Sequence, residues 1–232
     1  MIASATMALY TEDRYKSEVW SPDNGDGTYT NPVINADYSD PDVCVGASGH
    51  DYYMTASSFQ CVPGLPILHS KGLVNWEIIN YALGNLYEGD CKLLEHFSKP
   101  QHGAGVWAPS IRYHDGWYYI YWGDPDFGVY MVKTQDPAGQ WEKPVCVIRG
   151  KGYIDTTPLW DDDGRCYMMN GWAMRSKSPY GPYEHKIVLA QGKTNINGPH
   201  QGGYIRNTAK IGSCTSKIRR HTLDIDWIRV TK

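Results

Sequence analysis

Three aspartates, Asp37, Asp40 and Asp42, stand close together near the start of the chain. Pro41 fixes its own φ and favours an extended backbone at Asp40, and the apolar run that begins at Val43 is typical of a strand. A carboxylate held at the start of a sheet, where the sheet can shield it from water, is suited to act as a general base. Acidic residues beside a proline also make ordinary turns, which is the more common outcome for such residues taken alone.

A second carboxylate and a tryptophan have similar settings further along the chain. Asp155 precedes the hairpin signal at residues 161–164, so we expect it at the end of a strand, although taken alone it is an ordinary turn residue. Trp107 follows Gly103 and Gly105, and this position favours a loop over a buried core. Aromatic side chains in loops can stack on sugar rings.

Composition indicates the kind of fold that positions these residues. The 232 residues suffice for one sizeable domain or two small ones. The aromatic residues are mostly of the polar kind, with 18 Tyr and 9 Trp against 3 Phe, and such side chains suit strands with one wet face. The 24 Gly and 14 Pro are spread along the chain, which favours many short strands joined by turns.

Charge and cysteine usage exclude several classes of protein. The net charge is −3 without a basic block, so we expect no nucleic-acid partner, and no apolar run is long enough for a membrane span. The six cysteines form no C-x-x-C pair, which argues against a zinc site or a disulfide framework. Residues 1–10 lack the basic head of a signal peptide, and the location of the protein stays open.

Three repeated units organise the middle of the chain. Each has a tyrosine-rich strand, a second strand that ends in a lysine and a turn, and a closing aromatic–Glu pair. The units close at Trp76–Glu77, Trp141–Glu142 and Tyr183–Glu184. Several antiparallel strands per repeat predict the blades of a β-propeller, whereas a plain β-sandwich would not repeat the same internal order.

The third unit is shorter than the other two. Its strand pattern over residues 166–172 continues directly into Met174, and no hairpin is expected between them. We therefore expect a segment between Ala173 and Met174 to be missing.

Five separated motifs, in order, resemble glycoside hydrolase family 43, whose members cleave xylosides and arabinofuranosides. They are ADYSDPDV, HSKGLVNWE, GVWAPSIRYHDGWYYIYW, YIDTTPLWDDDGR and NINGPHQG. The resemblance implies an all-β fold, a five-bladed β-propeller that is incomplete here because blades 3 and 4 are shortened or merged. It divides the chain into an N-terminal extension (1–30), a glycosidase-like propeller (31–203) and a tail (204–232) that is similar to a remnant of a β-sandwich module.

The resemblance also assigns roles to individual residues. It implies that Asp40 is the general base of an inverting reaction and that Asp155 orients the acid and modulates its pKa. Trp107 and His102 match positions that line the sugar-binding pocket, and Phe59 is expected to form a further wall. The reaction requires no cofactor.

One further residue is assigned by the same resemblance. His200 matches the histidine that holds water or a structural calcium ion in the central channel.

The chain departs from the family at the proton donor. The family's general acid is a Glu in an E-G-P-like motif within the segment that is missing at Ala173/Met174. Glu184 follows a blade-closing aromatic and is expected at the outer edge. The sequence thus predicts a pentosidase of plant hemicellulose, of the β-xylosidase or α-L-arabinofuranosidase type, with weak activity or none. The alternatives are a non-catalytic carbohydrate-binding propeller remnant and a propeller used only for protein contacts.

Overall fold

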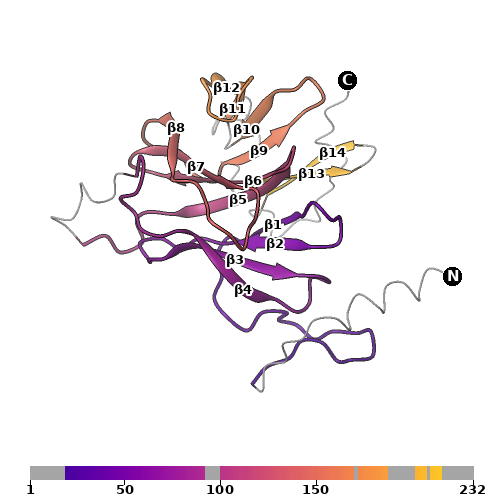
Figure 1. The fold of residues 1–232 in the computed structure, drawn as a ribbon. Helices are drawn as coiled ribbons and strands as arrows, with labels where there is room; N and C mark the ends of the chain where they lie inside the picture. The colour runs from indigo at the N-terminus through magenta and orange to yellow at the C-terminus, as the bar shows by residue number, and fades with distance from the viewer. Residues whose placement is uncertain (1–18, 92–99, 170–171, 188–201, 208–209, 216–232) are drawn as a thin grey trace.

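The computed structural model describes residues 19–91, 100–169, 172–187, 202–207 and 210–215. These ranges form 14 strands, and they contain no helix that is long and apolar enough to span a membrane. Three four-stranded antiparallel sheets follow one another along the chain, with their strands in chain order, and a two-stranded hairpin follows them (Figure 1). The described chain is thus all-β and built from blades, as the sequence predicts.

The three sheets are named blades 1 to 3. Blade 1 contains β1 (Asp42–Val45), β2 (Tyr52–Thr55), β3 (Gly64–Ser70) and β4 (Glu77–Leu83). Blade 2 contains β5 (Trp107–His114), β6 (Trp117–Asp124), β7 (Gly128–Thr134) and β8 (Val145–Arg149). Blade 3 contains β9 (Thr157–Trp160), β10 (Cys166–Met169), β11 (Trp172–Ser176) and β12 (Glu184–Ile187). The final hairpin pairs β13 (Gly202–Asn207) with β14 (Lys210–Thr215), and β13 lies beside β9.

Blade 3 corrects one detail of the sequence analysis. Residues 166–176 are two antiparallel strands rather than one continuous strand, with Met169 opposite Ala173. The two residues between the strands are Asn-Gly, the dipeptide most typical of a short hairpin. The expectation of no hairpin was wrong because the short spacing hid this turn signal. Blade 3 has four strands within residues 157–187, and β11 runs through Ala173 and Met174 without a break, so the strand is continuous at the position where a missing segment was expected.

The repeats seen in the sequence form one row of side chains in each blade. A tyrosine on the second strand lies opposite a basic residue on the third, which approaches a glutamate on the fourth strand or just before it. The basic and acidic groups are 3.8 Å apart in blade 1, 3.7 Å in blade 2 and 2.9 Å in blade 3. The rows are Tyr53–His69–Glu77, Tyr119–Lys133–Glu142 and Tyr167–Arg175–Glu184.

Two apolar cores join the blades. The first lies between blades 1 and 2 and includes Leu65, Ile67, Ile111, Trp122 and Trp141. The second lies between blades 2 and 3 and includes Tyr119, Tyr121, Met131, Met168 and Met174. Because Tyr53 and Tyr119 pack into the core that faces the next blade, we call the face with the Tyr–basic–Glu row the forward face and the opposite one the backward face.

The segments outside the blades are described only in part. Residues 19–30 contain a bridge between Asp23 and Tyr29, and Asn75 of blade 1 donates to Asp23 at 3.1 Å. The predicted boundaries at 30/31 and 203/204 stay predictions. The end of the predicted tail, residues 216–232, lies outside the described residues.

Candidate active site

Asp40 lies just before β1 and is half-buried. Its φ of 51° is in the left-handed region, so the expectation of an extended backbone before Pro41 was wrong, and this conformation costs a residue with a side chain about 1–3 kcal/mol. The Ser57 hydroxyl donates to Asp40 Oδ2 at 2.8 Å, and the Ser39 hydroxyl donates to the same oxygen at 3.2 Å. Two serines thus hold the carboxylate in one orientation, as a general base requires.

Ser57 also connects Asp40 to blade 2. The backbone N–H of Ala108, in β5, donates to Ser57 Oγ at 2.8 Å. Ala108 has a φ of 35°, and the pairing of β5 with β6 shifts between Trp107 and Ser110. Such a bulge redirects the side chains beside it. The start of β5 is therefore distorted at the point where it supports Asp40.

Trp107 and Phe59 lie on two segments that pair with each other. Phe59 and Val106 exchange two backbone hydrogen bonds, each of 3.0 Å, and Trp107 follows directly. The Trp107 indole N–H donates to the Gly103 carbonyl at 2.6 Å. Gly105 permits the close pairing, because a Cβ there would lie 2.4 Å from the Phe59 carbonyl oxygen. The backbone segments that carry the two predicted sugar-binding aromatics are thus neighbours in the structure.

His102 lies just before Gly103, whose carbonyl accepts the hydrogen bond from the Trp107 indole. It is exposed and stands in the turn that leads to Gly103. The Gly103 N–H donates to Gln60 Oε1 at 2.8 Å, and Gln60 follows Phe59 in the chain. The turn that carries His102 is thus joined by hydrogen bonds to the segments that carry Phe59 and Trp107.

Asp155 approaches the start of β5 from the other side. It is half-buried, precedes β9 and has a φ of 55°. The Ser110 hydroxyl, in β5, donates to the carbonyl of Thr156 at 2.6 Å. The first residues of β5 thus contact the support of Asp40 through Ala108 and the neighbour of Asp155 through Ser110. Asp40 and Asp155 consequently flank one short stretch of β5.

Arg112, further along β5, connects the first strands of the three blades, which are β1, β5 and β9. Its guanidinium forms an ion pair with Asp42 in β1 and donates to Thr157 Oγ1 in β9 at 2.8 Å. Asp42 and Thr157 each stand two residues after a predicted catalytic aspartate. Because Arg112 contacts both strands, Asp40 and Asp155 emerge at the same end of their strands, on either side of β5.

Asp42 is a structural carboxylate rather than a catalytic one. Burial raises its pKa, whereas the Arg112 charge and the backbone N–H of Ile111, which donates to it at 2.8 Å, lower the pKa. Burial is the larger of these effects. A buried carboxylate of this kind needs its ionic partner, so the pair ties blade 1 to blade 2.

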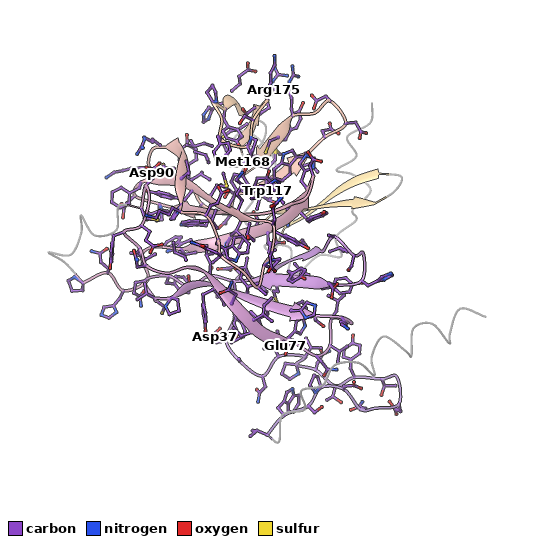
Figure 2. All side chains as sticks on the ribbon, viewed as in Figure 1. Asp37, Glu77, Asp90, Trp117, Met168 and Arg175 are labelled. Atoms are coloured by element: carbon purple, nitrogen blue, oxygen red, sulfur yellow. The ribbon has the colours of Figure 1, made fainter. Side chains whose placement is uncertain are left out.

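Sequence reasoning missed the residues that support the site. Ser57 and Ser110 carry no motif that distinguishes them from other serines, and their roles depend on contacts between blades. Arg112 had a usable signal, because a charged residue within an apolar strand needs a buried partner. Asp37, the third aspartate of the opening cluster, is exposed and lies beside blade 1 (Figure 2).

The metal prediction rests on a residue that the structure does not describe. His200 lies outside the described residues, so its assignment to calcium or water stays a prediction. Among the residues that are described, no group of three or more His, Cys, Asp or Glu side chains is placed to hold a metal ion.

Comparison with protein families and curated sequences gives consistent matches. The family model for glycosyl hydrolases family 43 matches residues 29–178. A protein of Xylanibacter ruminicola that carries the name of a beta-xylosidase is 32% identical, over 79% of this chain and 44% of its own length. The non-reducing end alpha-L-arabinofuranosidase of Bacteroides ovatus is 35% identical, over 62% of this chain and 26% of its own. The chain thus spans less than half the length of these relatives.

The first of these alignments also bears on the missing segment. It extends over 241 positions, more than the 232 residues of this chain, yet takes in only 79% of the chain. The relative therefore contains residues within the aligned region that have no counterpart here.

Solved structures match the arrangement of the blades. The GH43 protein BlXynB of Bacillus licheniformis superposes with a TM-score of 0.63 at 26% identity, over 80% of this chain and 37% of that one. A bifunctional GH43-CE protein of Bacteroides eggerthii gives a TM-score of 0.65 at 26% identity, over 79% of this chain and 25% of that one. These neighbours are five-bladed β-propellers, so the blades described here are part of that fold.

Proposed function

This chain belongs to glycosyl hydrolases family 43, and we propose that its site acts on pentosides of plant hemicellulose, as a β-xylosidase or an α-L-arabinofuranosidase. The observation that carries the proposal is the placement of Asp40 and Asp155 on either side of the start of β5, where the backbone segments of Phe59 and Trp107 also meet. Rings of this kind cover the apolar face of a sugar, and carboxylates act on the bond beside it. No cofactor enters the proposed reaction.

In the proposed reaction, Asp40 takes a proton from a water molecule as that water attacks the anomeric carbon. The bond to the leaving group breaks on the opposite face of the sugar, so the configuration inverts. An inverting site needs roughly 6.5–9.5 Å between its two working carboxyl groups to admit the water. Asp155 acts on the far side of β5, where it orients the group that protonates the leaving oxygen.

The general acid that would protonate the leaving oxygen is the group that we expect this chain to lack. The alignment with the Xylanibacter ruminicola protein contains positions that this chain lacks, and we propose that the family's general acid is among them. Glu184 does not replace it, because its side chain is 74% exposed and pairs with Arg175 at 2.9 Å on the outer part of blade 3. We therefore expect slow turnover, since a general acid typically contributes about 10²- to 10⁴-fold.

Substrates that differ only in their leaving group test this proposal. The 2,4-dinitrophenolate of a 2,4-dinitrophenyl pentoside departs without being protonated. The leaving sugar of xylobiose, in contrast, must receive a proton from a general acid. The quantity to compare is the ratio of kcat/KM for the dinitrophenyl pentoside to kcat/KM for xylobiose. We expect this ratio to be about 10²- to 10⁴-fold larger for this chain than for an intact family member assayed in parallel. Asp40→Asn should abolish the hydrolysis of both substrates, because the water then has no base.

Two results would contradict parts of the proposal. Ready hydrolysis of xylobiose that Asp40→Asn abolishes would mean that the chain does possess an acid, and the predicted impairment would be wrong. Hydrolysis that Asp40→Asn leaves unchanged would exclude Asp40 as the base.

A binding function without turnover is the second candidate. It is favoured by the presence of Phe59 and Trp107 in a chain that we propose to lack the general acid. Titration with xylose, arabinose and xylo-oligosaccharides, followed by tryptophan fluorescence, should then show saturable binding that Trp107→Ala weakens. Binding without release of product supports this candidate, and the absence of both excludes it.

A further inference from the structure

The turn that carries His102 has a defined shape. The Ala104 N–H donates to the Gln101 carbonyl at 3.0 Å, which closes a β-turn with His102 and Gly103 at its centre. Gly103 has a φ of 73°, the left-handed value that a type II turn requires at its third residue. Both central residues are exposed, and a Cβ added at Gly103 would meet no atom within 4 Å. Hydrogen bonds to neighbouring segments, rather than packing around Gly103, therefore set the position of this turn.

Gly103 connects two side chains that lie outside the turn. Its N–H donates to Gln60 Oε1 at 2.8 Å, and its carbonyl accepts the Trp107 indole N–H at 2.6 Å. We call this pair of bonds the Gly103 bridge. Gln60 is 43 positions from Gly103 in the sequence, whereas Trp107 is only 4 positions away. Gln60 therefore joins the local unit of turn and indole to a distant part of the chain.

Gln60 is a firm anchor because the segment before it is fixed. The Ser57 N–H donates to the Ser39 carbonyl at 2.9 Å, and Phe59 exchanges two hydrogen bonds of 3.0 Å with Val106. The backbone is thus attached to two different parts of the chain within the three residues that precede Gln60. A side chain that extends from such a segment restrains the turn instead of moving with it.

Trp107 is the residue that gains most from this restraint. It is half-buried and stands at the start of β5, where the pairing with β6 is shifted. A hydrogen bond to the indole N–H selects one ring orientation among the rotamers that the side chain can adopt. Ordering a mobile side chain during binding reduces affinity, so a ring that is already held in place binds its ligand more tightly.

We propose that Gln60 is a positioning residue of the sugar site, because it holds the turn at Gly103 and thereby fixes the Trp107 ring for stacking on a pentose. This inference rests on the proposed function, since it takes Trp107 as a residue that binds the sugar. Ser57, on the same segment, donates to Asp40. One loop between β2 and β3 thus supports both the base and the stacking ring, Ser57 through the carboxylate and Gln60 through the turn.

The Gly103 bridge is tested first without a ligand. The chain has 9 tryptophans, so ¹⁵N-labelled tryptophan gives nine indole N–H signals, and Trp107→Phe identifies the signal of Trp107. Gln60→Ala should shift this signal and speed its exchange with solvent by about two- to tenfold, the effect of losing one hydrogen bond. Gln60→Glu keeps an acceptor oxygen for Gly103 and should leave the signal protected. Gln135→Ala is the matched control, because Gln135 is exposed in the loop after β7 of blade 2.

Binding and kinetics test the consequence for the sugar. Gln60→Ala should raise the Kd for xylobiose or arabinose, and KM for the dinitrophenyl pentoside, by about two- to tenfold. Its kcat should change by less than about twofold, because the bond from Ser57 to Asp40 is untouched. Gln60→Glu should behave like the wild type. A bond that served only stability would leave Kd and KM unchanged, and circular dichroism confirms that the variants are folded.

The outcomes separate this inference from the proposed function. A wild-type chain that binds neither xylobiose nor arabinose overturns the proposed function, and with it the role of Gln60 in binding. Wild-type binding that Gln60→Ala leaves unchanged overturns the inference alone. A Trp107 indole signal that is the same in Gln60→Ala and in the wild type also overturns it.

Discussion

Blades 2 and 3 have the same strand order but differ in size and in how far they are covered. The strands of blade 2 contain 8, 8, 7 and 5 residues, whereas those of blade 3 contain 4, 4, 5 and 4. Blade 2 has an apolar core on each face, and blade 3 has a described core only on its backward face. We therefore expect blade 2 to contribute most to the stability of the fold, and blade 3 to be stable only when it is packed against blade 2.

The same difference reaches the site. Asp40 is supported by two serine hydroxyls, and one of these is tied to β5 of blade 2. Asp155 stands at the start of blade 3 and is placed through the contact between Ser110 and its neighbour Thr156. We expect the Asp40 side to be the more rigid half of the site, since Asp155 itself stands at the start of the shorter and less fully covered blade.

The largest predicted effect is in blade 2. Trp122 is 1% exposed and stacks on Tyr130 with 5.5 Å between ring centroids. Trp122→Ala should lower the free energy of unfolding by about 3–5 kcal/mol, because it leaves a large cavity in the first core. Urea denaturation followed by circular dichroism measures this change.

A smaller loss of stability is expected in blade 3. Met168 is fully buried in the second core, and Met168→Ala should lower the free energy of unfolding by about 2–4 kcal/mol in the same urea experiment. The loss is smaller because Met168 is smaller than Trp122 and the strands of blade 3 are short. If Met168→Ala proves more costly than Trp122→Ala, blade 3 is not the dependent blade.

Thiol labelling compares the two cores without mutation. Burial raises the pKa of Cys44, in the first core, to about 12 and that of Cys166, in the second core, to about 11. Both thiols are protonated at pH 8 and react only after local opening. Cys166 should label at least about tenfold faster than Cys44 in native buffer, since blade 3 opens more readily. Equal labelling rates for Cys44 and Cys166 would indicate that the blades open together as one cooperative unit. Cys61, which is exposed, provides the reference rate for an unprotected thiol.

The smallest effects compare two serines that connect the blades. Ser57→Ala removes bonds to both Asp40 and Ala108, whereas Ser110→Ala removes one bond to Thr156. Each bond is worth about 0.5–1.5 kcal/mol. Ser57→Ala should therefore lower the thermal midpoint more than Ser110→Ala in differential scanning fluorimetry. The reverse order would contradict the view that the Asp40 side is the more firmly held.

Local patterns were sufficient for the blades themselves. The repeated Tyr-rich strand, lysine turn and aromatic–Glu pair predicted the units that became blades 1 to 3. Glu184 was expected at the outer edge, and it is exposed and paired with Arg175. The hairpin between β10 and β11 was missed, although its Asn-Gly signal was present in the sequence.

The supports of the site could not be predicted in the same way. Ser57, Ser110 and Arg112 act across blade boundaries, and nothing in their local sequence states which strand will lie opposite. The assignments of Asp40 and Asp155 came from motifs, whereas their position on either side of β5 came from contacts between the inner strands.

The sequence by itself determined the strands, the turns and the repeated unit, because strand alternation and turn chemistry act over a few neighbouring residues. Only the tertiary structure decided which face of each blade is covered. Trp141 and Trp76 have the same local sequence setting, yet one is sealed by a preceding blade and the other lines a groove. Burial depends on residues distant in the chain, and no local pattern specifies them.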